Sequence, residues 1–267
     1  MAKQKTKEQI QTHCKSALAA IEKLLNGYID SEDPSIKTKA DKLSYWLEDY
    51  VKFLNYEPKF KPTSLRRYKR GEIVKVHLGY NIGSEEGGLH YCVVMDKANS
   101  IHSSTITVVP LTSVKSTTNI EKLHPGSVYL GNSIYTAMSA KFTSLKKITL
   151  DELDKANTQC EKLLELDQKN QTAECKSTET EQFINSETKR MQAEVTRLTD
   201  QVTLITKIKN EIEKMKIGSI ALVSQITTVS KIRIYDPKRN DDVLANIRLS
   251  NENLDLIDSE IQKLFLK

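Results

Sequence analysis

The chain has 267 residues, of which 38% are hydrophobic and 28% charged, enough for one or two domains whose core needs no disulfide or metal support. Its apolar runs fall far short of the roughly 20 residues of a membrane-spanning helix, and its basic start is not followed by an apolar signal segment. We therefore expect a cytoplasmic protein that makes no contact with a membrane.

The cysteines indicate a reducing compartment. They stand at positions 14, 92, 160 and 175 and form no C-x-x-C pair, which favours free thiols over a disulfide framework. Apart from His13 beside Cys14, no Cys or His residues show the spacing of metal ligands. We expect neither a metal nor a cofactor.

The positive charge is concentrated at the start of the chain. The net charge is +5, and residues 1–70 hold 15 Lys and Arg against 9 Asp and Glu. Residues 59–70 contain basic residues without an interposed acid, interleaved with Phe60 and Tyr68. Such a segment can follow a phosphate backbone and stack on bases, although a solvated linker has the same composition. The basic residues are Lys59, Lys61, Arg66, Arg67, Lys69 and Arg70.

Two amphipathic helices are predicted in the first 57 residues. Apolar residues recur every three or four positions over residues 7–29, after a capping box formed by Thr6 and Gln9. Asp33 followed by Pro34 marks the start of a second helix, which ends before residues 57–62. The two helices are expected to form a hairpin.

The hydrophobic period changes to that of strands after Gly71. Strands are predicted at residues 72–78, 91–95, 105–111 and 127–130, with a glycine-rich connection over residues 79–90. Later strands are predicted at residues 218–226 and 231–235, and Ser250 caps a final amphipathic helix.

A coiled coil is predicted between these two groups of strands. Residues 132–217 contain no Gly or Pro, and apolar residues follow three-and-four spacing on both sides of a polar stretch, residues 169–180, that reads as a tip. The later part of the expected apolar stripe consists of Met191, Val195, Leu198, Val202, Ile205, Ile208, Ile212 and Met215. One straight helix of about 66 residues would span roughly 100 Å, so an antiparallel hairpin is the arrangement that returns the chain to the strands.

Three segments together resemble the PemK/MazF family of toxin ribonucleases. They are residues 70–74 (RGEIV) leading into the loop 83–88 (GSEEGG), residues 108–113 (VVPLTS), and residues 218–228 (GSIALVSQITT). The resemblance implies an α+β fold: a small antiparallel β-barrel with a C-terminal helix. To this the chain adds an N-terminal helical hairpin and an inserted antiparallel coiled-coil hairpin. The expected divisions are residues 1–57, the basic linker 58–69, the first barrel half 70–140, the insertion 141–216, and the second barrel half with its helix 217–267.

The resemblance also implies a function: metal-independent, sequence-selective cleavage of single-stranded RNA that leaves a 2′,3′-cyclic phosphate. It implies a homodimer and a cognate antitoxin protein as partner. The expected catalytic residues are His90 and Thr112. Histidine exchanges protons near neutral pH, and the resemblance assigns the hydroxyls of Thr112 and Ser113 to holding the scissile phosphate. The expected RNA-binding residues are Ser84, Ser113, Gln225, Thr227, Arg66, Arg67, Lys69 and Arg70.

The sequence departs from the family pattern at two arginines. His90 stands where most members have Arg, Thr227 replaces the Arg of the later motif, and Ser224 replaces an acidic residue that some members carry. Fewer fixed positive charges therefore remain to stabilise a transition state. Candidates to compensate are Lys75, His77, Lys115, Lys231 and Arg233. The alternative is a catalytically impaired member that binds nucleic acid or protein as a regulatory module.

Overall fold

The structure is a computed structural model that describes residues 5–172 and 178–266. It divides into two compact units. Residues up to 61 together with 77–89 form the N-terminal unit, and residues 62–76 with 90 onward form the C-terminal unit. Within the described residues, every helix is too short or too polar to span a lipid bilayer.

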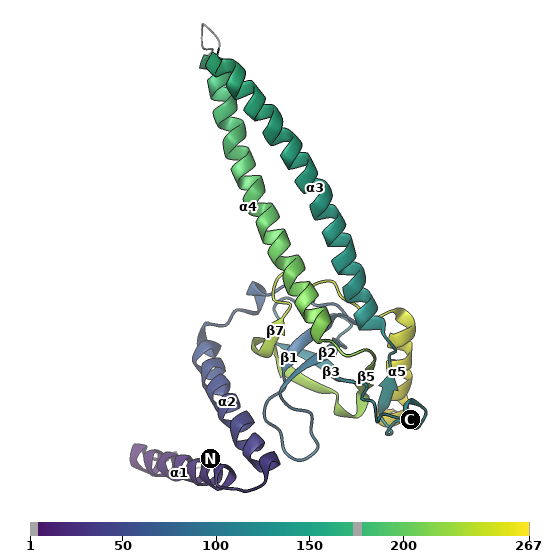
Figure 1. Cartoon of the computed structure of the whole chain (residues 1–267). Coiled ribbons are helices and arrows are strands. Elements are labelled where there is room, and N and C mark those ends of the chain that lie inside the picture. Colours follow the sequence, from purple (N-terminus) through teal and green to yellow (C-terminus); the bar gives the residue numbers. More distant parts are fainter. Residues whose placement is uncertain (1–4, 173–177, 267) are drawn as a thin grey trace. The chain divides into compact units, whose positions relative to one another are not determined.

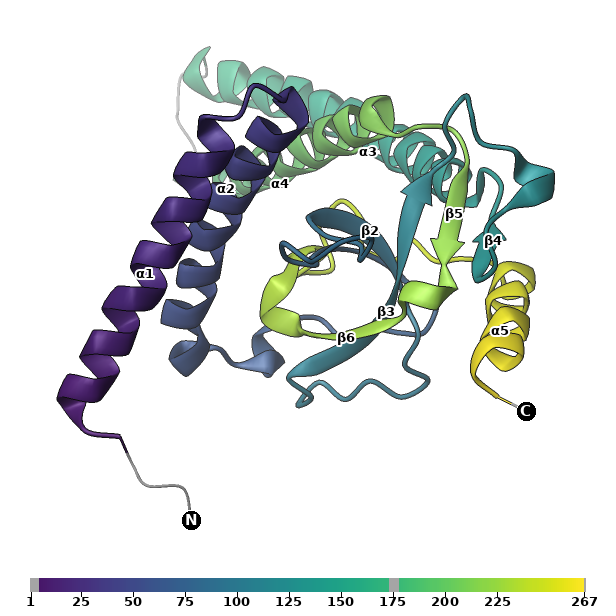
Figure 2. The ribbon, with the colours of Figure 1, turned by 90° about the horizontal axis from the view of Figure 1, so that it is seen from below.

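The N-terminal unit contains the two predicted helices, α1 (Lys7–Ile29) and α2 (Pro34–Tyr56), which lie side by side (Figures 1 and 2). Both predicted starts are confirmed. The Thr6 hydroxyl accepts a hydrogen bond from the Gln9 backbone N–H, and the Gln9 side chain accepts one from the Thr6 N–H. The Asp33 carboxylate accepts from the Ser35 N–H at 2.8 Å, with Pro34 at the first helical position. Capping therefore fixes where both helices begin.

The glycine-rich loop belongs to the N-terminal unit and packs on α2. The His77 ring stacks on Trp46 with 4.6 Å between ring centroids. Gly79 has a φ of 106°, and a Cβ there would lie 3.3 Å from the Trp46 ring. The base of the loop is closed by two backbone hydrogen bonds, from Leu78 to Gly88 and from Gly88 to Gly79.

An antiparallel sheet forms the body of the C-terminal unit. Its strand order is β4-β5-β3-β2-β1-β7, with β6 also paired to β3. The long strand β3 pairs with β6 through its first half and with β5 through its second half, so the sheet curls (Figure 2). The strands are β1 (Ile73–His77), β2 (Leu89–Val94), β3 (Thr105–Ser113), β4 (Ser127–Tyr129), β5 (Ser219–Leu222), β6 (Thr227–Ser230) and β7 (Ile234–Asp236).

The last helix, α5 (Asn251–Phe265), covers one side of this core. Its predicted cap is confirmed, because the Ser250 hydroxyl accepts from the Asn253 N–H. Leu254 and Ile257 from α5 are buried with Ile73, Val93 and Val109 of the sheet. The α+β fold expected from the resemblance is thus confirmed.

Two strand predictions near the end of the chain need correction. The strand predicted at 218–226 ends at Leu222 and is followed by a 3-10 turn, Val223–Gln225. The strand predicted at 231–235 begins with another 3-10 turn, Lys231–Arg233. Lys231 is 2% exposed, and its Nζ donates to the Ser100 carbonyl at 2.9 Å. A buried lysine held by a distant carbonyl breaks the alternation on which the prediction depended.

The insertion is an antiparallel pair of helices, α3 (Ser133–Thr172) and α4 (Thr178–Lys214) (Figure 1). Helix α3 begins at residue 133, earlier than the expected boundary at 141. Part of the predicted tip, residues 173–177, lies outside the described residues, and so does Cys175.

The predicted apolar stripe of α4 is only partly correct. Met191, Leu198 and Ile208 are buried, whereas Val195 and Val202 are 54% and 51% exposed. A helix that packs against a single partner buries a narrow face, and these two valines lie at the margin of that face.

The roots of both helices belong to the core of the sheet. Ile134 and Met138 of α3 and Ile208 of α4 are buried in the same apolar cluster as the strands. The Lys141 ammonium donates to three backbone carbonyls, of Asp242, Val243 and Ala245, at 2.8–2.9 Å. Burial lowers the pKa of Lys141. The insertion is therefore anchored to the sheet.

Candidate active site

The ends of β2 and β3 bring together the two residues expected to be catalytic. These strands pair antiparallel, with Cys92 opposite Pro110 and Val94 opposite Val108. Extending this register by two residues puts His90 opposite Thr112, and opposed residues point to the same face of a sheet. His90 is half-buried, and its Nδ1 lies 3.2 Å from the Leu111 carbonyl oxygen.

This hydrogen bond selects a tautomer of His90. A carbonyl oxygen can only accept a hydrogen bond, so the contact requires Nδ1 to carry a proton. In the neutral ring the lone pair then lies on Nε2, the nitrogen that can take a proton from a substrate.

A small hollow of about 70 Å³ lies beside Thr112 and Ser113. It has the volume of about two water molecules. The sequence predicted the hydroxyl pair, but it did not predict the two lysines that join it from the end of the insertion, Lys214 and Lys216. The lining residues are Tyr91, Leu111, Thr112, Ser113, Ile134, Lys214, Met215, Lys216 and Ser219.

A hydrogen-bonded group joins the end of α4 to the sheet. The Lys75 ammonium donates to the Glu211 carboxylate at 2.6 Å, and the Tyr91 hydroxyl donates to the same oxygen. Burial acts to raise the pKa of Glu211, but these hydrogen bonds outweigh it and hold the pKa below its usual range. Burial, followed by the hydrogen bond to Glu211, raises the pKa of Tyr91. Glu211 is therefore an ionised anchor for the last turn of α4.

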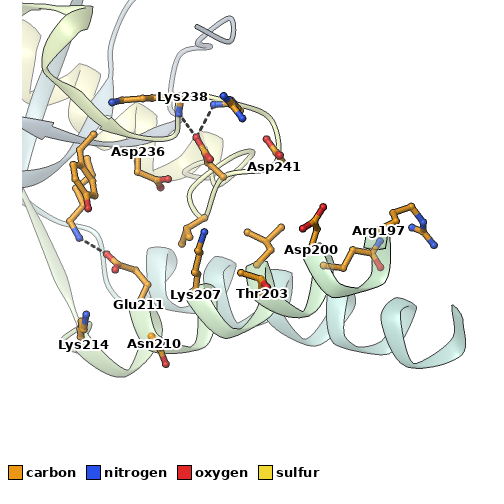
Figure 3. A pocket seen from close by; sticks show the side chains of 17 residues that line it. Arg197, Asp200, Thr203, Lys207, Asn210, Glu211, Lys214, Asp236, Lys238 and Asp241 are labelled. Atoms are coloured by element: carbon orange, nitrogen blue, oxygen red, sulfur yellow. Dashed lines mark hydrogen bonds and ion pairs between the residues drawn. The ribbon is translucent and has the colours of Figure 1, made fainter. Parts of the chain in front are cut away.

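A larger open groove of about 1000 Å³ runs between α4 and the segment 235–243 (Figure 3). Lys207 points from α4 toward the segment that carries Asp236 and Asp241. Burial raises the pKa of Asp236, whose carboxylate accepts from the Leu244 N–H at 2.8 Å. Lys214 lines both this groove and the hollow beside Thr112, so the two share that residue in their walls.

Two of the other expected site residues, Gln225 and Thr227, belong to the same unit as His90 and Thr112. Thr227 is exposed and pairs with Val108, about 13 Å along β3 from Thr112 at 3.3 Å per residue. Gln225 is half-buried in the preceding 3-10 turn. Ser84 is exposed and belongs to the N-terminal unit.

Arg66 and Arg70, which were also expected to bind RNA, have contacts within the fold. The Arg66 guanidinium donates two hydrogen bonds, of 3.1 and 3.3 Å, to the Glu72 carboxylate, and the side chains are 5% and 4% exposed. Arg70 donates to the Met95 carbonyl and to Asp258. The neighbouring Arg67 and Lys69 are exposed.

Two of the expected compensating cations are engaged in contacts within the fold. Lys75 is paired with Glu211, Lys231 is buried, and His77 belongs to the N-terminal unit. Lys115 is exposed. In residues 5–172 and 178–266, no three His, Cys, Asp or Glu side chains are grouped as metal ligands.

The comparison with family models gives a match over half of the chain. The family described as PemK-like, MazF-like toxin of type II toxin-antitoxin system matches residues 69–203. This range contains the first two motifs, helix α3 and most of α4, whereas the third motif at 218–228 lies beyond it. The comparison with curated proteins gives no match. The chain belongs to the PemK-like, MazF-like family of toxins of type II toxin–antitoxin systems.

Proposed function

We propose that this toxin is an endoribonuclease that cuts single-stranded RNA without a metal ion. The observations that carry the proposal are the contact of His90 Nδ1 with the carbonyl of Leu111, the residue before Thr112, and the hollow that Thr112 and Ser113 line. Cleavage by an internal nucleophile requires a group that transfers protons and groups that stabilise charge on the phosphate. Histidine can serve as the first, and hydroxyls and cations as the second.

The proposed reaction uses the ribose 2′-OH as the nucleophile. Nε2 of His90 takes the 2′-OH proton while the 2′-oxygen bonds to phosphorus. The bond from phosphorus to the 5′-oxygen breaks, and that oxygen takes a proton from water, while the protonated His90 returns its proton to the solvent. Thr112 and Ser113 donate hydrogen bonds to the phosphoryl oxygens, where negative charge develops. The products are a 2′,3′-cyclic phosphate and a 5′-OH.

The partners of the reaction follow from the family. We propose that the toxin acts as a homodimer in the cytoplasm and that a cognate antitoxin protein inhibits it. RNA is the substrate, and sequence selectivity comes from contacts with its bases.

The direct test is incubation of the purified protein with a long single-stranded RNA in EDTA. We expect cleavage at a limited set of sites, because the proposed chemistry uses side chains alone. DNA of the same sequence is the matched control and should remain intact, because it lacks the 2′-OH. Intact RNA at several pH values, with folded protein, would instead support the binding-module alternative.

Arg67 and Lys69 are expected to contribute to RNA binding without holding the fold together. Both are exposed, so the double change to Gln should weaken binding and lower the slope of log K against log salt by about 1.4, at about 0.7 per phosphate contact. The same charge change at Lys162 and Lys169, exposed on α3, is the control. A slope equal to that of the control would show that Arg67 and Lys69 do not contact RNA phosphates.

A further inference from the structure

The insertion places unpaired positive charge beside the proposed active site. Lys214 is the last residue of α4, and Lys216 follows it in the segment that leads into β5. Both line the hollow that Thr112 and Ser113 also line. These lysines follow Thr112 by 102 and 104 positions in the sequence, and the return of the helical hairpin brings them to it.

The backbone that carries the lysines is firmly held. Glu211, one helical turn before Lys214, is hydrogen-bonded by Lys75 and Tyr91 from two strands of the sheet. Ile212 and Met215 pack against the core. The ammonium groups therefore extend from a fixed base, which reduces the entropy lost when they bind a ligand.

Among the described charged side chains that line the adjoining groove and the hollow, more cations than carboxylates lack a hydrogen bond or ion pair. Lys75 is paired with Glu211, and Arg197 with Glu152 and Glu194. The Asp242 carboxylate accepts from the backbone N–H groups of Lys238 and Arg239. Among the described residues, five cationic side chains at the hollow and the groove have no hydrogen bond or ion pair, against two such carboxylates, Asp200 and Asp241. The cations are Lys207, Lys214, Lys216, Lys238 and Arg239.

We propose that Lys214 and Lys216 supply positive charge at the scissile phosphate. They would thereby take the place of the two family arginines that are replaced here by His90 and Thr227. In this account the groove over Lys207 binds the adjacent phosphates of the same RNA strand. The inference rests on the proposed cleavage of RNA. It makes the helical insertion part of the active site and explains how a chain without the two family arginines retains cations there. A lysine acts on a phosphate as a point charge, which requires less exact geometry than a guanidinium.

The test is the double variant Lys214→Gln/Lys216→Gln, assayed for cleavage and for binding of an RNA with 2′-deoxyribose at the cut site. We expect kcat/KM to fall about 10²-fold, as when a donor to the developing charge is removed. The slope of log K for RNA binding against log salt concentration should fall by about 1.4. The variant Lys214→Arg/Lys216→Arg should retain most of the wild-type kcat/KM and most of the wild-type salt dependence of binding. Lys207→Gln should weaken binding and raise KM, because it contacts a non-reacting phosphate.

The matched control is Lys189→Gln/Lys209→Gln, which changes the same charge on α4 outside both cavities. If wild type cuts RNA and the Lys214/Lys216 variant behaves like this control, the inference is overturned. If wild type binds RNA but does not cut it, the proposed function fails, and the salt slope alone decides whether these lysines bind phosphate. Thermal unfolding of each variant checks that all are folded.

Discussion

Replacing His90 with Ala is expected to slow RNA cleavage about 10²–10⁴-fold, the usual contribution of a general acid or base. RNA binding should stay nearly unchanged, because phosphate contacts rather than the imidazole dominate affinity. The structure supplies the reason for the selective loss. The Leu111 carbonyl holds Nδ1 as the donor, and the change removes the Nε2 lone pair that receives the proton.

Two measurements separate this role from a structural one. Added imidazole should partly restore cleavage by the variant, and the variant should lose the limb of the pH–rate profile that reports the base. His124→Ala is the matched control, because His124 is exposed and its Nδ1 contacts the adjacent Pro125 carbonyl. Wild-type cleavage by His90→Ala would remove His90 from the proposed mechanism.

Replacing Arg66 with Ala is expected to lower the free energy of unfolding by about 3–5 kcal/mol, the cost of breaking a buried ion pair from one side. Glu72 is 3% exposed and would keep a charge with no guanidinium beside it. Two further hydrogen bonds would be lost, from Arg66 to Asn240 and to Asn246, each 3.0 Å. Urea unfolding measures the change through the shift of the midpoint.

Arg67→Ala is the matched control for this prediction. Arg67 is adjacent and exposed, and surface substitutions usually change stability by no more than about 0.5 kcal/mol. Equal stability of the two variants would mean that the Arg66–Glu72 pair contributes little to the fold. It would also return Arg66 to the set of residues that could bind RNA.

The sequence predicted those parts of the fold that local patterns encode. Thr6, Asp33 and Ser250 mark helix starts because a capping side chain bonds to backbone a few residues away. Alternation of apolar and polar residues likewise predicted β1, and short strand-like runs predicted β2 to β4. The strand predicted at residues 231–235 shows where this reasoning failed. Lys231 is buried because its ammonium bonds to the Ser100 carbonyl, and no local pattern reveals a contact so distant in the sequence.

The candidate site was predictable only as far as the family motifs extend. His90, Thr112 and Ser113 stand in such motifs, and the register of β2 and β3 accounts for their proximity. Lys214 and Lys216 follow no motif, because their position depends on the full length of the hairpin and on the anchoring of Glu211.

The first family motif also has a structural explanation. Arg70 bonds to the Met95 carbonyl, and Glu72 accepts from the Lys69 N–H as well as from Arg66. Gly71 between them has a φ of 82°, and a Cβ there would lie 2.8 Å from Leu254 of α5. The RGE segment therefore ties the first strand to the rest of the sheet unit.

The chemical identity of the fragment ends tests the central claim most directly. RNA cut by the wild-type protein in EDTA is predicted to carry a 2′,3′-cyclic phosphate and a 5′-OH at every mapped site. A single 2′-deoxynucleotide placed 5′ to the scissile bond should block cutting at that site alone. Fragments with a 5′-phosphate and a 3′-OH, or continued cutting at the deoxy position, would contradict attack by the 2′-OH and the roles given to His90 and Thr112.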